Sequence, residues 1–270
     1  MLIQFANTLW PLTLALPLFF AALWRILSKN KTYEIVDAFW CWALGICAIY
    51  CAIRFEGYLP RRILVAGLAL FWALRLGGHL LWGRVKKGLR DGRYEHWLKE
   101  SGENSDLFMF GFFQIQAISV LALTVTFAAV CQTTHTWSFF DLLGIILFVT
   151  ALAGEWKADK TLNKFRLNPN NKGQVCDQGL WAYSRHPNYF FEWIHWCSYL
   201  LLTGLHMPQV LFALSGPIIM LWLITKVSGI PLTEAQTLRS RGDAYKKYQQ
   251  TTPSFFPNLF RKELSHDRSS

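Results

Sequence analysis

The sequence predicts an all-α, polytopic integral membrane protein with seven transmembrane helices, the N-terminus outside and the C-terminus in the cytoplasm. The first observation is composition: 53% of the 270 residues are hydrophobic and only 16% are charged, whereas soluble domains average about 25% charged residues. The second is that the apolar residues form long blocks, each near the ~20 residues that a membrane-spanning helix needs. The third is the uneven distribution of Lys and Arg among the connections.

The apolar blocks define the expected helices in chain order. They lie at 3–24, 34–53, 62–82, 107–130, 138–156, 189–205 and 209–229. The helix of the fifth block is expected to continue in polar form to about residue 166. A cluster of turn-forming residues at 168–174 follows it. Because no segment of domain size is left over, the chain 1–270 is expected to be one domain.

The orientation follows from the basic residues. Of the 27 Lys and Arg, twenty-three lie in 25–33, 84–106, 157–188 and 226–270, three lie in 54–62, and none lies near 131–137 or 206–208. Cytoplasmic connections carry the excess of Lys and Arg, so the first four segments are expected in the cytoplasm. An odd number of spans then agrees with seven. The net charge of +10 thus has a membrane explanation and does not indicate nucleic-acid binding.

The cysteines and histidines do not indicate a metal site. The six cysteines lack CxxC spacing and lie mostly inside apolar blocks, and the seven histidines form no HExxH. Such cysteines are typical of small buried hydrophobic residues. No metal is therefore expected.

Three ionisable residues inside the apolar blocks are candidate functional groups, because charge at that depth is costly. Asp37 lies one turn into the second block, and it could either interact with the helix dipole or line a cavity. Arg75 and His79 are four residues apart in the third block and share a helical face. They could form an internal ion pair, for which Asp37 is a candidate partner, or the polar wall of a substrate pocket.

Polar and charged residues also gather at the expected cytoplasmic edge. Arginine forks bind phosphate, and a carboxylate accepts hydrogen bonds from ribose or amide donors, so these residues suit an anionic nucleotide. No GxGxxG or Walker sequence is present, so the site would be non-Rossmann. The alternative to a ligand site is that Arg185 contacts lipid phosphates and Asn188 caps a helix. The set is Arg93, Asp159, Arg166, Arg185, His186, Asn188, Glu192 and Tyr245.

Five motifs, in this order, carry a family resemblance. They are Asp37-x-x-Trp40, Asp91-Gly-Arg-Tyr94, Glu155-x-x-x-Asp159, Gly179-Leu-Trp-x-Tyr-Ser-Arg-His-Pro-Asn-Tyr189 with Glu192, and Ser228-Gly-Ile-Pro-Leu-Thr-Glu234 with Tyr245-x-x-Tyr248 and Phe256-Pro257. With them the chain resembles the membrane superfamily of steroid 5-alpha-reductases, sterol reductases and isoprenylcysteine carboxyl methyltransferases. Within it, the chain is most similar to the bacterial DUF1295 branch.

The resemblance implies an enzyme, and Asn188 with Glu192 follows the reductase pattern. It implies NADPH-dependent reduction of a carbon–carbon double bond conjugated to a carbonyl in a lipophilic substrate, such as a 3-oxo-4-ene steroid. The alternative is an S-adenosylmethionine-dependent methyltransferase of the isoprenylcysteine type, and a third hypothesis is a non-enzymatic lipid-binding protein. The expected partners are the lipophilic substrate and membrane lipid, and no protein partner is evident.

The resemblance also implies roles within a cofactor half at roughly 139–260. Asn188 and Glu192 would contact the nicotinamide, Asp159 and Arg166 the ribose and phosphates, with Arg185, His186, Tyr189 and Tyr245 also at the cofactor and Arg93 at its 2′-phosphate. The cofactor site would face the cytoplasm of a bacterial inner membrane.

The expected catalytic residues are Glu192, Asp37 and Arg75, with His79 near Arg75. In steroid reductases an acid and a tyrosine from the N-terminal half meet the carbonyl. Asp37 is the expected acid, and no tyrosine of this chain is matched to the second role. Phe191 stands where a glycine is common and is expected to narrow the pocket.

Overall fold

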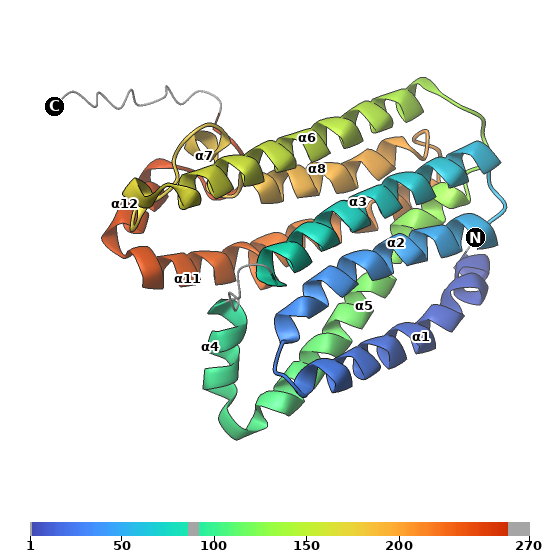
Figure 1. The fold of residues 1–270 in the computed structure, drawn as a ribbon. Coiled ribbons are helices and arrows are strands. Elements are labelled where there is room, and N and C mark those ends of the chain that lie inside the picture. The colour runs from blue at the N-terminus through green and yellow to red at the C-terminus, as the bar shows by residue number, and fades with distance from the viewer. Residues whose placement is uncertain (1, 86–91, 259–270) are drawn as a thin grey trace. The chain divides into compact units, whose positions relative to one another are not determined.

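A computed structural model describes residues 2–85 and 92–258 of the chain (Figure 1). Over these residues the chain forms helices and no strands, which confirms the all-α class. The helices are α1 (Leu2–Ser28), η1 (Tyr33–Ile35), α2 (Val36–Arg54), α3 (Leu59–Val85), α4 (Gly92–Ser101), η2 (Gly102–Asn104), α5 (Ser105–Cys131), α6 (Phe139–Leu167), η3 (Pro169–Asn171), α7 (Leu180–Tyr183), α8 (Pro187–Leu201), α9 (Gln209–Ala213), α10 (Ser215–Trp222), η4 (Leu223–Val227), α11 (Ile230–Arg241) and α12 (Asp243–Thr251).

Six helical stretches within the described residues are long and apolar enough to cross a membrane, as expected for an integral membrane protein. They are Ile3–Ser28, Tyr33–Arg54, Leu59–Trp82, Gly92–Cys131, Phe139–Leu167 and Gln209–Arg241. The block at 189–205 corresponds to α8, which has 15 residues. At 1.5 Å per residue it is ~22 Å long, less than the ~30 Å hydrocarbon core. The count of seven and the orientation of the termini therefore stay predictions.

The chain groups into two compact units, which we call the N-terminal unit (1–145 and 196–219) and the C-terminal unit (146–195 and 220–270). The division falls within α6, α8 and α10. The C-terminal unit overlaps the expected cofactor half, 139–260. The expectation of a single domain stays a prediction.

The N-terminal unit is built on close helix packing. Helix α2 packs against α3 and α5, and α1 packs against α5. At Gly45 of α2 an added Cβ would lie 2.9 Å from the Cβ of Ala73 in α3, so the glycine lets the two helices approach closely. Trp72 and Trp196 meet edge to face with ring centroids 5.9 Å apart at the core.

The C-terminal unit is built on the antiparallel pair α6 and α8 (Figure 1). Helix α6 runs on to Leu167, as the sequence predicted, and the turn cluster after it forms η3. The indole Nε1 of Trp181 donates to the carbonyl of Ala158 at 2.9 Å. Together with Phe165 and Cys176, these residues form a buried cluster that joins α6 to the loop before α8.

Candidate functional site

Antiparallel contacts set the register of α8 on α6. The Asn188 amide meets Asp159, the ring of Phe191 fills the space beside Gly154, and further along His195 meets Phe148 with ring centroids 5.1 Å apart. One turn from the Asn188–Asp159 contact, this register brings Glu192 of α8 opposite Glu155 of α6.

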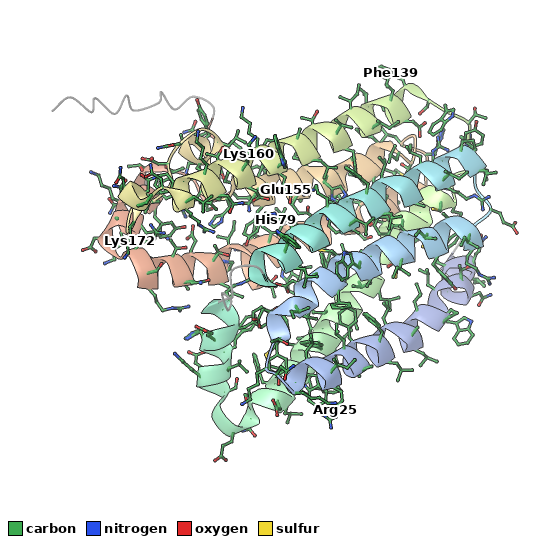
Figure 2. All side chains as sticks on the ribbon, in the orientation of Figure 1. Arg25, His79, Phe139, Glu155, Lys160 and Lys172 are labelled. Carbon is green, nitrogen blue, oxygen red and sulfur yellow. The ribbon has the colours of Figure 1, made fainter. Side chains whose placement is uncertain are left out.

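Two carboxyl groups are therefore buried on the facing sides of these helices. Glu155 is 4% exposed and Glu192 is 7% exposed. The exposed side of α6 is different: Lys160 lies there, over the ring of Trp156, whereas Glu155 is buried (Figure 2). The α6–α8 interface thus contains buried carboxyl groups, and its role as a ligand site stays a prediction.

The orientation of the Asn188 amide follows from its neighbour. Its Nδ2 donates to Oδ1 of Asp159 at 3.3 Å, and an ionised carboxylate only accepts hydrogen bonds. The amide oxygen must therefore point away from Asp159. This oxygen is buried and finds no hydrogen-bond donor among the described residues. A buried acceptor of this kind costs about 1–3 kcal/mol, so the site suits a ligand with an N–H or O–H group.

Glu192 has a histidine beside it that sequence reasoning missed. Nδ1 of His195 lies 3.7 Å from Oε1 of Glu192, and the histidine side chain is fully buried. The signal was available, because residues three apart share a helical face. A neutral imidazole has one ring nitrogen that donates a hydrogen bond and one that accepts, so His195 can orient the Glu192 carboxyl group.

Arg185 and His186 converge on a carboxylate that the sequence analysis did not single out. Nε of Arg185 donates to Oε1 of Glu234 at 2.7 Å, and Nε2 of His186 lies 3.2 Å from the same oxygen. Nη1 of Arg185 also donates to the backbone carbonyls of Gln249 at 3.0 Å and Thr252 at 2.5 Å. These contacts are with the protein itself. The predicted cofactor contacts of Arg185 and His186 stay predictions.

Tyr245 joins the same carboxylate, because its hydroxyl donates to Oε1 of Glu234 at 3.3 Å. Burial raises the pKa of Tyr245, and the nearby negative charge of Glu234 raises it further, so the hydroxyl keeps its proton. Burial lowers the pKa of His186, although the hydrogen bond to Glu234 opposes this shift. A neutral His186 would donate its Nε2 proton to Glu234, which fixes its tautomer.

Tyr189 and Arg166 complete the predicted set in the C-terminal unit. The hydroxyl of Tyr189 lies 3.1 Å from Oγ1 of Thr233, and its ring is nearly parallel to that of His186. Arg166, two turns after Asp159 on α6, lies within electrostatic range of Asp159 and of Arg241 on α11. Two neighbouring guanidinium groups favour an anion between them.

The predicted residues of the N-terminal unit form a second polar group. Oδ1 of Asp37 accepts from the Tyr94 hydroxyl at 2.8 Å, and its Oδ2 lies 3.3 Å from Nη2 of Arg93. An ion partner of Asp37 is thus Arg93, and Tyr94 is a candidate that the sequence analysis missed. Its signal was its place in the Asp-Gly-Arg-Tyr motif, whose Asp91 lies outside the described residues.

Arg75 and His79 both lie on α3, where Figure 2 labels His79. The side chain of Arg75 is half-buried and that of His79 is exposed. Their predicted roles at a substrate stay predictions. Among residues 2–85 and 92–258, no group of three or more His, Cys, Asp or Glu side chains is placed to hold a metal ion.

Comparison with known proteins gives one match. A family model described as a protein of unknown function (DUF1295) matches residues 23–252. No curated protein and no solved structure matches the chain. The matched range includes all five motifs except the last two aromatic-proline residues.

Proposed function

The chain belongs to the DUF1295 family, and we propose that it is an NADPH-dependent oxidoreductase that reduces a carbon–carbon double bond conjugated to a carbonyl. The proposed substrate is lipophilic, such as a 3-oxo-4-ene steroid or a similar lipid. The observation that carries the proposal is the buried amide oxygen of Asn188, which finds no donor among the described residues. The carboxamide group of a nicotinamide offers such a donor.

The neighbours of Asn188 support a dinucleotide. Asp159, which holds the Asn188 amide, would accept hydrogen bonds from a ribose. Arg166, near the second guanidinium of Arg241, would hold a phosphate, since arginine forks match phosphate oxygens. Glu192, one turn after Asn188 on α8, would accept a second hydrogen bond from the carboxamide. Arg93 remains the proposed contact of the 2′-phosphate.

When bound, NADPH would supply a hydride for the β-carbon of the enone, and the α-carbon would take a proton from solvent or from the donor at the carbonyl oxygen. The protein would bind the cofactor, exclude water and polarise the carbonyl oxygen of the substrate. Within the N-terminal unit, Tyr94 carries the hydroxyl group that we propose as a donor to a carbonyl oxygen. The hydroxyl of Tyr94 donates to Asp37, and the guanidinium carbon of Arg93 lies 5.9 Å from the centre of its ring. A tyrosine hydroxyl can turn its proton from one acceptor to another. Asp37 and Arg75 remain the other proposed catalytic residues.

The proposal includes a membrane topology. Seven spans, with α8 as a short sixth one, would place the N-terminus outside and the C-terminus in the cytoplasm of a bacterial inner membrane. The Lys- and Arg-rich segments support this orientation. The start of α8, with Arg185 to Asn188, would then face the cytoplasm, where NADPH is available.

Titration of the purified protein with NADPH and with S-adenosylmethionine tests the proposal. We expect NADPH to bind, and Asn188→Ala to weaken it about tenfold, which corresponds to one lost hydrogen bond. Asp243→Asn is the matched control, because this carboxylate is exposed on α12. Binding of S-adenosylmethionine alone would favour the methyltransferase, and binding of neither would favour a lipid-binding protein.

Turnover provides the second arm of the test. Glu192→Ala is expected to abolish NADPH-dependent reduction of a 3-oxo-4-ene steroid while the protein stays folded. Glu192→Gln, which keeps the side-chain shape, separates loss of charge from loss of volume. Wild-type turnover in Glu192→Ala would contradict the assigned role.

A further inference from the structure

Glu234 on α11 forms hydrogen bonds with two segments of the C-terminal unit, the loop before α8 and helix α12. Its Oε1 accepts from Arg185 at 2.7 Å and lies 3.2 Å from His186, both in the loop before α8. Its Oε1 also accepts from Tyr245 at 3.3 Å and its Oε2 from Gln249 at 2.8 Å, both on α12. The Glu234 side chain is only 15% exposed, so a lost partner would not simply be replaced by water.

The loop before α8 is also bound to the backbone that follows α12. The amide of Arg185 donates to the carbonyl of Pro253 at 2.9 Å, and its guanidinium binds the carbonyl of Thr252. Oγ of Ser184 donates to the carbonyl of Phe255 at 2.8 Å. We call residues 243–258 the C-terminal clasp, because they hold residues 184–186 through these bonds.

The clasped loop leads directly into the start of α8. Oγ of Ser184 accepts from the amide of His186 at 3.1 Å. The carbonyl of His186 accepts from the amide of Phe190 at 3.1 Å, so His186 is the N-cap residue immediately before α8. Asn188 lies in the first turn of that helix. Any shift of His186 therefore moves the amide that faces Asp159.

We propose that Glu234 is a positioning residue for the cofactor site: it fixes Arg185 and His186, and thereby Asn188, against the C-terminal clasp. Binding of the dinucleotide is then coupled to the order of α11 and α12. Hydrogen bonds to an ionised carboxylate are about twice as strong as neutral ones, which is why one acid can hold three segments. The coupling rests on the proposed function, whereas the clasp does not.

Two substitutions separate charge from shape at this position. Glu234→Gln keeps the size of the side chain and loses the negative charge, while its amide nitrogen cannot accept from Gln249. Glu234→Asp keeps the charge and shortens the side chain, so it is the rescue variant. Asp243→Asn is again the control. It removes an exposed carboxylate at the start of α12 whose hydrogen-bond partner among the described residues is the neighbouring Lys246, and not Glu234 or residues 184–186.

Amide hydrogen exchange of the full chain in detergent gives the first measurement. In Glu234→Gln we expect faster exchange in 243–258 and in 185–191, with wild-type exchange in α2, α3 and α5. Glu234→Asp is expected to lie between Glu234→Gln and the wild type, and Asp243→Asn to match the wild type. Unchanged exchange at 185–191 in both Glu234 variants would overturn the proposal.

Cofactor affinity gives the second measurement. Loss of positioning in Glu234→Gln is expected to raise the Kd and KM for NADPH about tenfold, the effect of one weakened charged hydrogen bond. The KM for the enone is expected to stay at its wild-type value, a split that general destabilisation would not produce. Failure of the wild type to bind NADPH would overturn the proposed function and its coupling to the clasp. The exchange data would still decide whether Glu234 fixes residues 185–191.

Discussion

His186 is a buried histidine on which two opposing influences act. Burial lowers its pKa from the ordinary value of 6.5, and the Glu234 carboxylate raises it in part. We therefore predict a titration midpoint below 6.5 for His186 in NMR spectra of histidine-labelled protein. In Glu234→Gln the midpoint is expected to fall further, because the group that favours the protonated form is removed.

The same pKa shift has a consequence for stability. The unfolded histidine takes up a proton near its ordinary pKa, whereas the folded one does so only at lower pH. The contribution of His186 to stability is thus present above pH 6.5 and is lost as the pH falls through the lowered pKa.

A variant lacking His186 assigns the NMR signal. A midpoint above 6.5, or a rise in Glu234→Gln, would contradict the prediction.

Single residues also show which contacts could be predicted from the sequence. Asp159 and Asn188 were expected at one site, and the structure brings them within hydrogen-bond distance. Glu234 was part of a quoted motif, yet no spacing rule relates residue 234 to Arg185, 49 positions earlier. Such a pair is created by the path of the chain through α8 to α11, which periodicity within one helix cannot reveal.

At the scale of elements, the close packing of α6 against α8 depends on a glycine, Gly154, which has no side chain. A Cβ at Gly154 would overlap the ring of Phe191. Overpacking of this kind costs ~1–3 kcal/mol, so we predict that Gly154→Ala lowers the midpoint of thermal unfolding. The measurement is thermal unfolding of the detergent-solubilised protein.

Gly67→Ala is the matched control for Gly154→Ala. Gly67 lies within α3, and nothing lies within 4 Å of a Cβ added there. Alanine also has a better helix propensity than glycine by about 1 kcal/mol. Gly67→Ala is thus expected to be neutral or stabilising. Adding Phe191→Leu to Gly154→Ala should restore part of the loss. Equal unfolding midpoints for the two alanine variants would refute the close fit.

The length of α8 shows where hydrophobicity stops being a guide to an element. The apolar block continues to residue 205, whereas the helix ends at Leu201. Beyond it Gly204 has φ +64 and Leu205 φ +57, so the chain turns in the left-handed conformation that often ends helices. Gly204 and Pro208 are sequence signals of a helix end. They lie within an apolar stretch, and the predicted block was therefore extended past the end of the helix.

At the scale of the whole molecule, one buried ion pair joins distant parts of the N-terminal unit. Arg61 and Asp141 are 0% and 2% exposed and make two hydrogen bonds of 2.8 Å. Arg61 also donates to the carbonyls of His135 and Thr136. We predict that Arg61→Met destabilises the protein by ~3–5 kcal/mol, because it leaves a buried carboxylate without its cation.

Thermal or denaturant unfolding of Arg61→Met, of Asp141→Leu and of the double variant forms a double-mutant cycle that checks this prediction. Arg61→Met with Asp141→Leu removes both charges and is expected to cost less than Arg61→Met alone. Equal losses in the single and the double variant would show that the packing of Arg61, not its charge, is what matters. The exposed pair Lys246–Asp243 is the control, for which we expect an effect near zero.

The same pair bears on the orientation of the chain. Segment 54–62 contains three arginines on the side expected to be outside. Two of them are bound by the protein itself: Arg61 by Asp141 and Arg62 by the carbonyl of Phe55. Their positions are thus explained by local pairing, and the asymmetry of the remaining Lys and Arg favours a cytoplasmic C-terminus.

Reporter fusions decide between six and seven spans, because an odd number puts the termini on opposite sides and an even number puts them on the same side. We predict that alkaline phosphatase is active when fused at the N-terminus or inserted near residues 134 and 206. A fluorescent protein inserted near residue 30 or 172, or fused at the C-terminus, is expected to fluoresce. Active phosphatase at residue 172 together with a fluorescent C-terminal fusion would contradict the topology. Active phosphatase at both termini would show that 15 residues of α8 do not cross the membrane.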